Sequence, residues 1–91
     1  MTNFMVLSVK VIKIIENKGS TEICGLYELE NNHIHIKCLA FDSQIRKKAC
    51  GFSKDDRVLI TGCLGKPEVK EFKDSHIALP IVYICDIIAN E

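Results

Sequence analysis

One stretch of the chain alternates ring-bearing and basic side chains with small apolar ones. Residues 33–41 read His-Ile-His-Ile-Lys-Cys-Leu-Ala-Phe, and successive side chains of a β-strand point to opposite faces. One face then carries the compact apolar set Ile34, Ile36, Cys38 and Ala40, which suits a core. The other face carries His33, His35, Lys37, Leu39 and Phe41. Rings beside a lysine on an exposed face suit the stacking of nucleobases combined with a phosphate contact.

Phe41 is the first candidate for a stacking contact, and the alternative is that it covers a barrel end or lies in a subunit interface. His35 and Lys37 share its face and are the next candidates, against the alternative of an ordinary solvated strand face. His33 is interpreted as part of such a solvated face. Tyr27 either stacks on a base or closes the core, and its apolar neighbours favour the core or an interface.

Other basic residues extend the candidate binding surface. Lys10 and Lys13 occur in the first apolar run, where they could meet phosphates. A second group combines lysines with an aromatic in one polar connection; its members are Lys66, Lys70, Phe72 and Lys73. The alternative for this group is an ordinary exposed loop. The basic run at residues 46–48 is interpreted as the solvent-exposed face of a short helix.

Length and composition predict one ordinary globular domain spanning residues 1–91. Hydrophobic residues make up 47% of the chain and charged residues 26%, which is typical of a folded domain and not of a disordered one. The formal net charge is zero, from 12 basic and 12 acidic residues. This balance counts against nucleic-acid binding without excluding it, because the charge of one face matters more than the sum.

The cysteines predict neither disulfides nor a metal site. The five cysteines are odd in number and irregularly spaced, which indicates free, buried thiols in a reducing compartment. Strand parity sends Cys38 to the face opposite His33 and His35, and no paired Cys-x-x-Cys occurs. The sequence also shows no phosphate-cradling glycine loop and no histidine placed beside Asp42 and Ser43. We therefore expect a protein that is not an enzyme and needs no cofactor.

No apolar run reaches the length of a membrane span, and the N-terminus lacks the pattern of a secretory signal. The expectation is a cytoplasmic protein without membrane contact, or a protein of an organelle stroma if it is organelle-encoded.

Apolar periodicity predicts an all-β chain. The expected strands are Phe4–Ile15, Thr21–Leu29, His33–Phe41, Arg57–Leu64 and Ile77–Ala89. One short helix is expected at Ser43–Cys50, capped by Ser43, with Ile45, Ala49 and Phe52 on one face. A polar connection spans residues 65–75, and Gly62 is interpreted as a strand bend. Five strands with a helix between the third and fourth predict the OB-fold, a small Greek-key barrel.

The central part of the chain resembles bacterial and organellar single-stranded DNA-binding proteins. In that family an aromatic ends the third strand, a small helix follows, and a Lys-Gly-Asp-x-Val-x-Val-x-Gly-x-Leu phrase begins the fourth. Here Phe41 and the helix Gln44 to Ala49 precede residues 54–64, which read Lys-Asp-Asp-Arg-Val-Leu-Ile-Thr-Gly-Cys-Leu, with Asp55 in place of the glycine. The opening residues 3–12 are similar to the family's first strand.

The chain also departs from the family pattern. It has no tryptophan, whereas the family commonly stacks bases on tryptophan in strands two and three. Lys10 stands where a glycine is usual, and Cys63 stands where arginine is common. The chain ends at Glu91 without the family's glycine-rich linker and acidic tip, so it looks like a short, tail-less relative comparable to primosomal OB-fold proteins.

The resemblance implies sequence-tolerant binding of single-stranded DNA in replication. It places His35 and Lys37 where strand three of the family carries a stacking aromatic and a basic residue. Two alternatives stay open, namely an OB-fold interaction or oligomerisation module and a binder of single-stranded RNA. Residues 4–15 and 77–88 carry apolar side chains on both faces, which predicts a homodimer or homotetramer.

Overall fold

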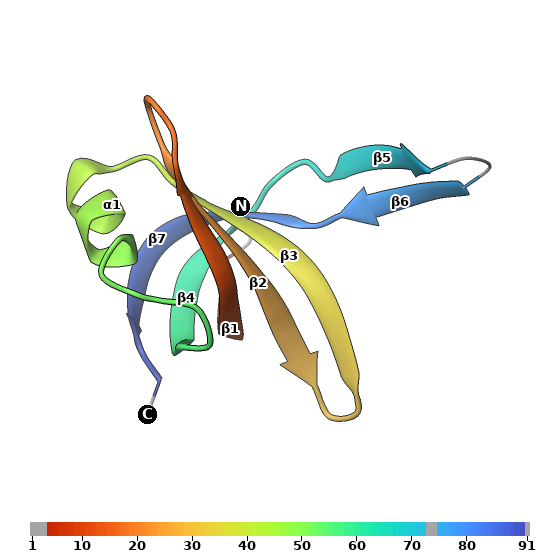
Figure 1. Ribbon diagram of the computed structural model, residues 1–91, viewed down its shortest axis with the longest axis horizontal. Helices are drawn as coiled ribbons and strands as arrows, with labels where there is room; N and C mark the ends of the chain where they lie inside the picture. The colour runs from red at the N-terminus through yellow and green to blue at the C-terminus, as the bar shows by residue number, and fades with distance from the viewer. Residues whose placement is uncertain (1–3, 73–74, 91) are drawn as a thin grey trace.

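The barrel consists of β1 (Phe4–Glu16), β2 (Thr21–Leu29), β3 (Asn32–Ala40), β4 (Arg57–Leu64) and β7 (Ile81–Ala89). Within residues 4–72 and 75–90, the part of the chain that the computed structural model describes, these strands close in the order β1–β2–β3–β7–β4. α1 (Ser43–Ala49) lies between β3 and β4, and β5 (Glu68–Phe72) pairs with β6 (Ser75–Leu79) in a separate hairpin. Figure 1 shows this hairpin projecting from the barrel, away from α1. The predicted OB-fold barrel is confirmed.

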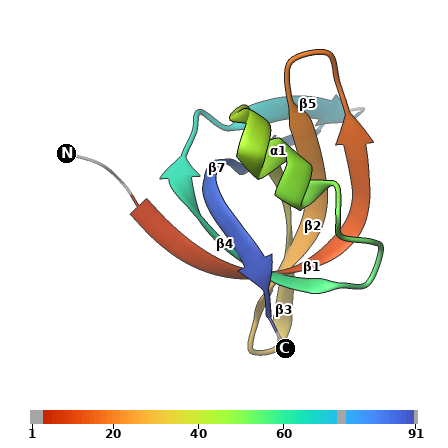
Figure 2. The ribbon, with the colours of Figure 1, turned by 90° about the vertical axis from the view of Figure 1, so that its left-hand side faces the viewer.

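Closure of the barrel depends on the long first strand and on one parallel pairing. β1 is antiparallel to β2 along one edge and to β4 along the other. Its register to β2 shifts between Val11 and Lys13, a bulge that bends the strand around the barrel. β3 and β7 are paired in parallel. Figure 2 shows the strong curvature of β1, which sweeps from the N-terminal side of the view around to its arrowhead on the opposite side of the barrel.

The core forms from the inward face of each strand. Ile36, Cys38 and Ala40 are buried on β3 as their alternation predicts. Ile34 was expected with them but is exposed, and that prediction is wrong. β3 pairs with β7 only from Lys37 onward, so at Ile34 it has β2 alone beside it. The β2–β3 hairpin therefore extends past the closed part of the barrel.

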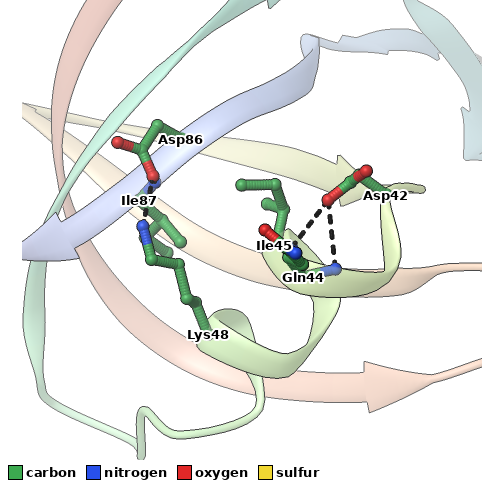
Figure 3. A network of polar contacts seen from close by, with 6 residues as sticks. All are labelled: Asp42, Gln44, Ile45, Lys48, Asp86 and Ile87. Atoms are coloured by element: carbon green, nitrogen blue, oxygen red, sulfur yellow. Dashed lines mark hydrogen bonds and ion pairs between the residues drawn. The ribbon is translucent and has the colours of Figure 1, made fainter.

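α1 covers the barrel beside β7, β3 and β2. Ala49 is fully buried, and Ile45 and Phe52 pack against the core, as predicted from their spacing. The cap is Asp42 and not the expected Ser43, because the Asp42 carboxylate accepts hydrogen bonds from the backbone N–H groups of Gln44 and Ile45. Figure 3 shows this cap together with the ion pair between Lys48 and Asp86, which ties the helix to β7.

The turn before β4 explains one departure from the family phrase. Asp55 has a φ of 74°, a left-handed conformation that glycine adopts freely and that aspartate tolerates better than most residues. Its backbone N–H donates to the carbonyl of Val11, while the Val11 N–H donates to the carbonyl of Asp56. Asp55 thus occupies a turn position at which a glycine would meet no strain.

Two sequence predictions about the C-terminal third are wrong. The expected polar connection at residues 65–75 contains β5, which pairs with β6 in register from Glu68↔Leu79 to Phe72↔Ser75. The expected single strand Ile77–Ala89 is divided at Pro80 into β6 and β7. Proline has no backbone N–H to donate to a ladder, and the Pro80 carbonyl instead accepts from the N–H of Lys37. Among the described residues, no helix is long and apolar enough to cross a membrane.

Candidate nucleic-acid interface

Two aromatic rings form an exposed pair on the outside of the barrel. The ring centroids of Phe41 and Tyr83 are 5.8 Å apart, and the ring planes are tilted by 55°. Phe41 is 58% exposed and Tyr83 is 41% exposed, so each ring offers surface to solvent while the other supports it. Tilted pairs at this spacing are favourable beyond the area that they bury.

The parallel pairing of β3 with β7 brings these rings together. Leu39 is the register partner of Tyr83, and Phe41 follows directly after the end of β3. On β7, Val82 and Ile84 point into the core, which turns Tyr83 outward.

The Tyr83 ring packs against the backbone of Gly65. A Cβ atom at Gly65 would lie 2.7 Å from Cε2 of Tyr83, so the ring rests directly on the glycine backbone. Sequence reasoning missed Tyr83 as a site residue. The alternation of residues 82–84 could have placed it outward, but nothing local indicates that it meets Phe41.

The outer surface of β1, β2 and β3 adds basic and imidazole side chains. Two rows cross it, each with one residue from each strand: Lys10–Leu26–His35 and Lys13–Cys24–Lys37. Both rows point outward, because the alternate residues of β2, Ile23 and Gly25, are buried. The structure therefore brings together four predicted site residues, Lys10, Lys13, His35 and Lys37, on one face. We call this surface the β1–β2–β3 outer face.

Lys37 is engaged by carboxylates from two other strands. Its Nζ donates a hydrogen bond to Glu68 at the start of β5 and lies 3.7 Å from Glu22 of β2. The Glu68 hydrogen bond is the main cause that raises the pKa of Lys37, and the charge of Glu22 adds to it. The lysine side chain is only 17% exposed. Lys37 thus ties the base of the β5–β6 hairpin to the barrel in this state.

Other charges at this face are also balanced. Lys10 forms an ion pair with Asp55 at 3.7 Å, and Arg57 forms one with Glu28 at 3.2 Å. Lys13 is exposed on β1. This balance is the structural counterpart of the zero net charge of the chain. A polyanion would have to compete with these carboxylates for the lysines.

The remaining predicted site residues lie elsewhere. Tyr27 is partly buried and packs against the core, on the face of β2 opposite to Leu26 and Cys24. Lys66 is exposed just before β5. Lys70 and Phe72 belong to β5 by their backbone, and Lys73 lies outside the described residues. The structure therefore does not group Tyr27 with the aromatic pair.

A shallow hollow of about 290 Å³ lies beside α1. It is lined by Glu16, Thr21, Ser43, Arg46, Lys47 and Cys50. The Cys50 thiol donates a hydrogen bond to the Glu16 carboxylate at 2.7 Å, and this bond is the main cause that raises its pKa. An activated nucleophilic cysteine has a lowered pKa. The hollow therefore lacks the features of a thiol active site.

The cysteines differ in part from the sequence expectation. All five are free, but only Cys38 is buried, while Cys50 and Cys85 are exposed. Cys50 caps the end of α1, and Cys85 is outward on β7. Within residues 4–72 and 75–90, no group of three or more His, Cys, Asp or Glu side chains could hold a metal ion.

No family model matches the chain, and no curated protein matches it by sequence. Solved structures do match. The small single-stranded DNA-binding protein of Streptomyces coelicolor aligns with a TM-score of 0.75 at 10% identity, over 98% of this chain and 94% of that protein. Rim1, the mitochondrial single-stranded DNA-binding protein of S. cerevisiae, aligns with a TM-score of 0.74 at 14% identity, over 98% of this chain and 95% of Rim1. The chain is an OB-fold barrel that shares its fold, along nearly its whole length, with single-stranded DNA-binding proteins.

Proposed function

We propose that this chain binds single-stranded DNA without sequence preference, as a binding protein and not as an enzyme. The observation that carries the proposal is the exposed Phe41–Tyr83 pair on a barrel whose fold is that of two single-stranded DNA-binding proteins. Every base has a flat face, so stacking on exposed rings tolerates any sequence. The pair replaces in part the tryptophans that the chain lacks.

The proposed path of the bound DNA runs from the aromatic pair across the β1–β2–β3 outer face. His35 supplies a further ring for stacking, and Lys10 and Lys13 supply contacts to phosphates. Lys37 joins them when a phosphate replaces Glu68 as its partner. Lys66, Lys70, Phe72 and Lys73 would extend the path along the hairpin, while the packing of Tyr27 against the core argues against a stacking role for it.

The test is a fluorescence anisotropy titration of labelled oligo-dT, followed by competition with unlabelled oligo-dT, oligo-U and duplex DNA. The proposal predicts displacement by oligo-dT at far lower concentration than by duplex, because paired bases cannot stack on protein rings. Stronger displacement by oligo-U than by oligo-dT would identify an RNA binder instead. Absence of binding at low salt would favour the interaction module.

We further propose that the chain assembles into a homodimer or homotetramer. The support is the outer surface formed by β1, β4 and β7, which adjoins the aromatic pair because Phe4, Cys63 and Tyr83 share one register row. Phe4 and Val6 of β1 and Ile88 of β7 are exposed on it, and the register places Leu59 of β4 beside Ile88. Large exposed apolar patches mark association surfaces. A second copy of the chain presents the same surface, so contact between two copies would bury this surface on each of them.

A further inference from the structure

Two cysteines meet on the outside of the barrel. The Sγ atoms of Cys63 on β4 and Cys85 on β7 are 4.0 Å apart, within hydrogen-bonding contact of thiols. Both side chains point outward, since their neighbours Gly62 and Ile84 are buried.

The backbone between β4 and β7 explains why these thiols come so close. The register shifts between Thr61 and Gly62, so Cys85 is the extra residue of a bulge opposite them. A Cβ atom at Gly62 would collide with the carbonyl oxygen of Tyr83. The glycine therefore permits an approach of the two strands that a larger residue would prevent.

We propose that Cys63 and Cys85 form a reversible intrachain disulfide by exchange with a low-molecular-weight disulfide such as oxidised glutathione. The exposed Cys85 is the point of attack for the small molecule, and the partly buried Cys63 is the resolving thiol. The bond would close a covalent loop that contains the β5–β6 hairpin and Tyr83. The inference rests on the thiol geometry of the single chain. Phe4, Cys63 and Tyr83 share one register row, so bound DNA and the assembly proposed above would both limit access to Cys85, and the reaction is carried out on dilute protein without DNA.

The exchange balances in two steps. The Cys85 thiolate attacks one sulfur of the small disulfide, whose S–S bond breaks and releases one small thiol that takes up the proton lost by Cys85. The Cys63 thiolate then attacks the Cys85 sulfur of the mixed disulfide and releases the second small thiol with the second proton. The two protein thiols lose two electrons in total, and the small disulfide gains them. A reducing small thiol reverses both steps.

The test incubates the reduced protein with oxidised glutathione at mildly alkaline pH, because burial and the hydrogen bond with Cys63 raise the pKa of Cys85. Intact mass should fall by two hydrogens with no glutathione retained. Non-reduced trypsin digestion should link peptide 58–70 to peptide 74–91. The thermal unfolding midpoint should rise by about 5–10 °C, since a closed loop restricts the unfolded chain, and return on reduction.

Matched variants show which two cysteines form the disulfide. C63S and C85S should each abolish the internal link, whereas C50S, which removes an exposed thiol beside Glu16 and Thr21, should leave it intact. Stable glutathione adducts on wild-type protein without a linked peptide would overturn the proposal. So would covalent dimers joined through Cys85, because they would show that this thiol reacts between chains and not with Cys63.

Discussion

Phe41 and Tyr83 hold their ring centroids 5.8 Å apart, although the two residues belong to different thirds of the chain. Their contact exists only because β3 and β7 are parallel neighbours in the barrel. Each ring remains substantially exposed while it contacts the other. An exposed pair of rings in mutual contact suits the stacking of bases, and the first and last predictions follow from it.

The first prediction separates binding from folding at this pair. F41A should weaken oligo-dT binding by about 1–3 kcal/mol, while the free energy of unfolding should change little because Phe41 is mostly exposed. V69A is the control, since Val69 is 61% exposed on β5 and belongs neither to the aromatic pair nor to the β1–β4–β7 surface. Anisotropy and urea titrations measure the two quantities. Equal losses of affinity in both variants would contradict a role specific to Phe41.

The second prediction concerns the carboxylate that occupies Lys37. E68Q should strengthen oligo-dT binding and steepen its dependence on salt by about one released counterion, because a phosphate then competes with the Glu22 carboxylate alone for Lys37. E30Q removes the same charge at an exposed site in the β2–β3 turn and is the control. If both variants strengthen binding equally, the effect comes from net charge, and the prediction of a Lys37–phosphate contact is contradicted.

The barrel was predictable from the sequence because its signals are local. Alternation at residues 36–40 predicted the buried face of β3, and the spacing of Ile45, Ala49 and Phe52 predicted the face of α1 that packs on the core. The β5–β6 hairpin was missed, because Glu68, Lys70 and Glu71 make that stretch look like a polar loop.

The candidate site was only partly predictable, because its contacts are not local. Strand parity identified the outward side chains of β3, but the pairing of β3 with β7 decides that Tyr83 joins Phe41. Likewise, Lys37 looked available on its own strand, and its partners Glu22 and Glu68 come from β2 and β5. A strand pattern shows which face a side chain takes and leaves open what lies beside it.

The third prediction tests the close approach of β4 and β7. G62A should lower the free energy of unfolding by about 1–3 kcal/mol, because the added methyl group would overlap the Tyr83 carbonyl oxygen and crowd Val82. G19A is the control, since a Cβ at Gly19 meets nothing within 4 Å. Urea unfolding of both variants measures the difference. A G62A protein as stable as G19A would show that the strands can separate there without cost.

The fourth prediction concerns assembly. V6E should convert the proposed homo-oligomer to a monomer, because a charge would be buried at the contact between copies. V69E is closely matched, since Val69 is 61% exposed on β5 and Val6 is 65% exposed on β1. Light scattering at micromolar concentration gives the mass of each. A wild-type protein of 10.3 kDa in that measurement would contradict the assembly proposal directly.

The central claim is that bases stack on the Phe41–Tyr83 pair, and tyrosine fluorescence tests it most directly. The chain has two tyrosines and no tryptophan, so Y27F leaves Tyr83 as the sole emitter. Saturating oligo-dT should quench this emission with the same midpoint as the anisotropy titration, and F41A should shift that midpoint to higher concentration. Oligo-dT that binds without changing the Tyr83 emission would contradict the claim, and the binding face would then have to lie elsewhere on the barrel.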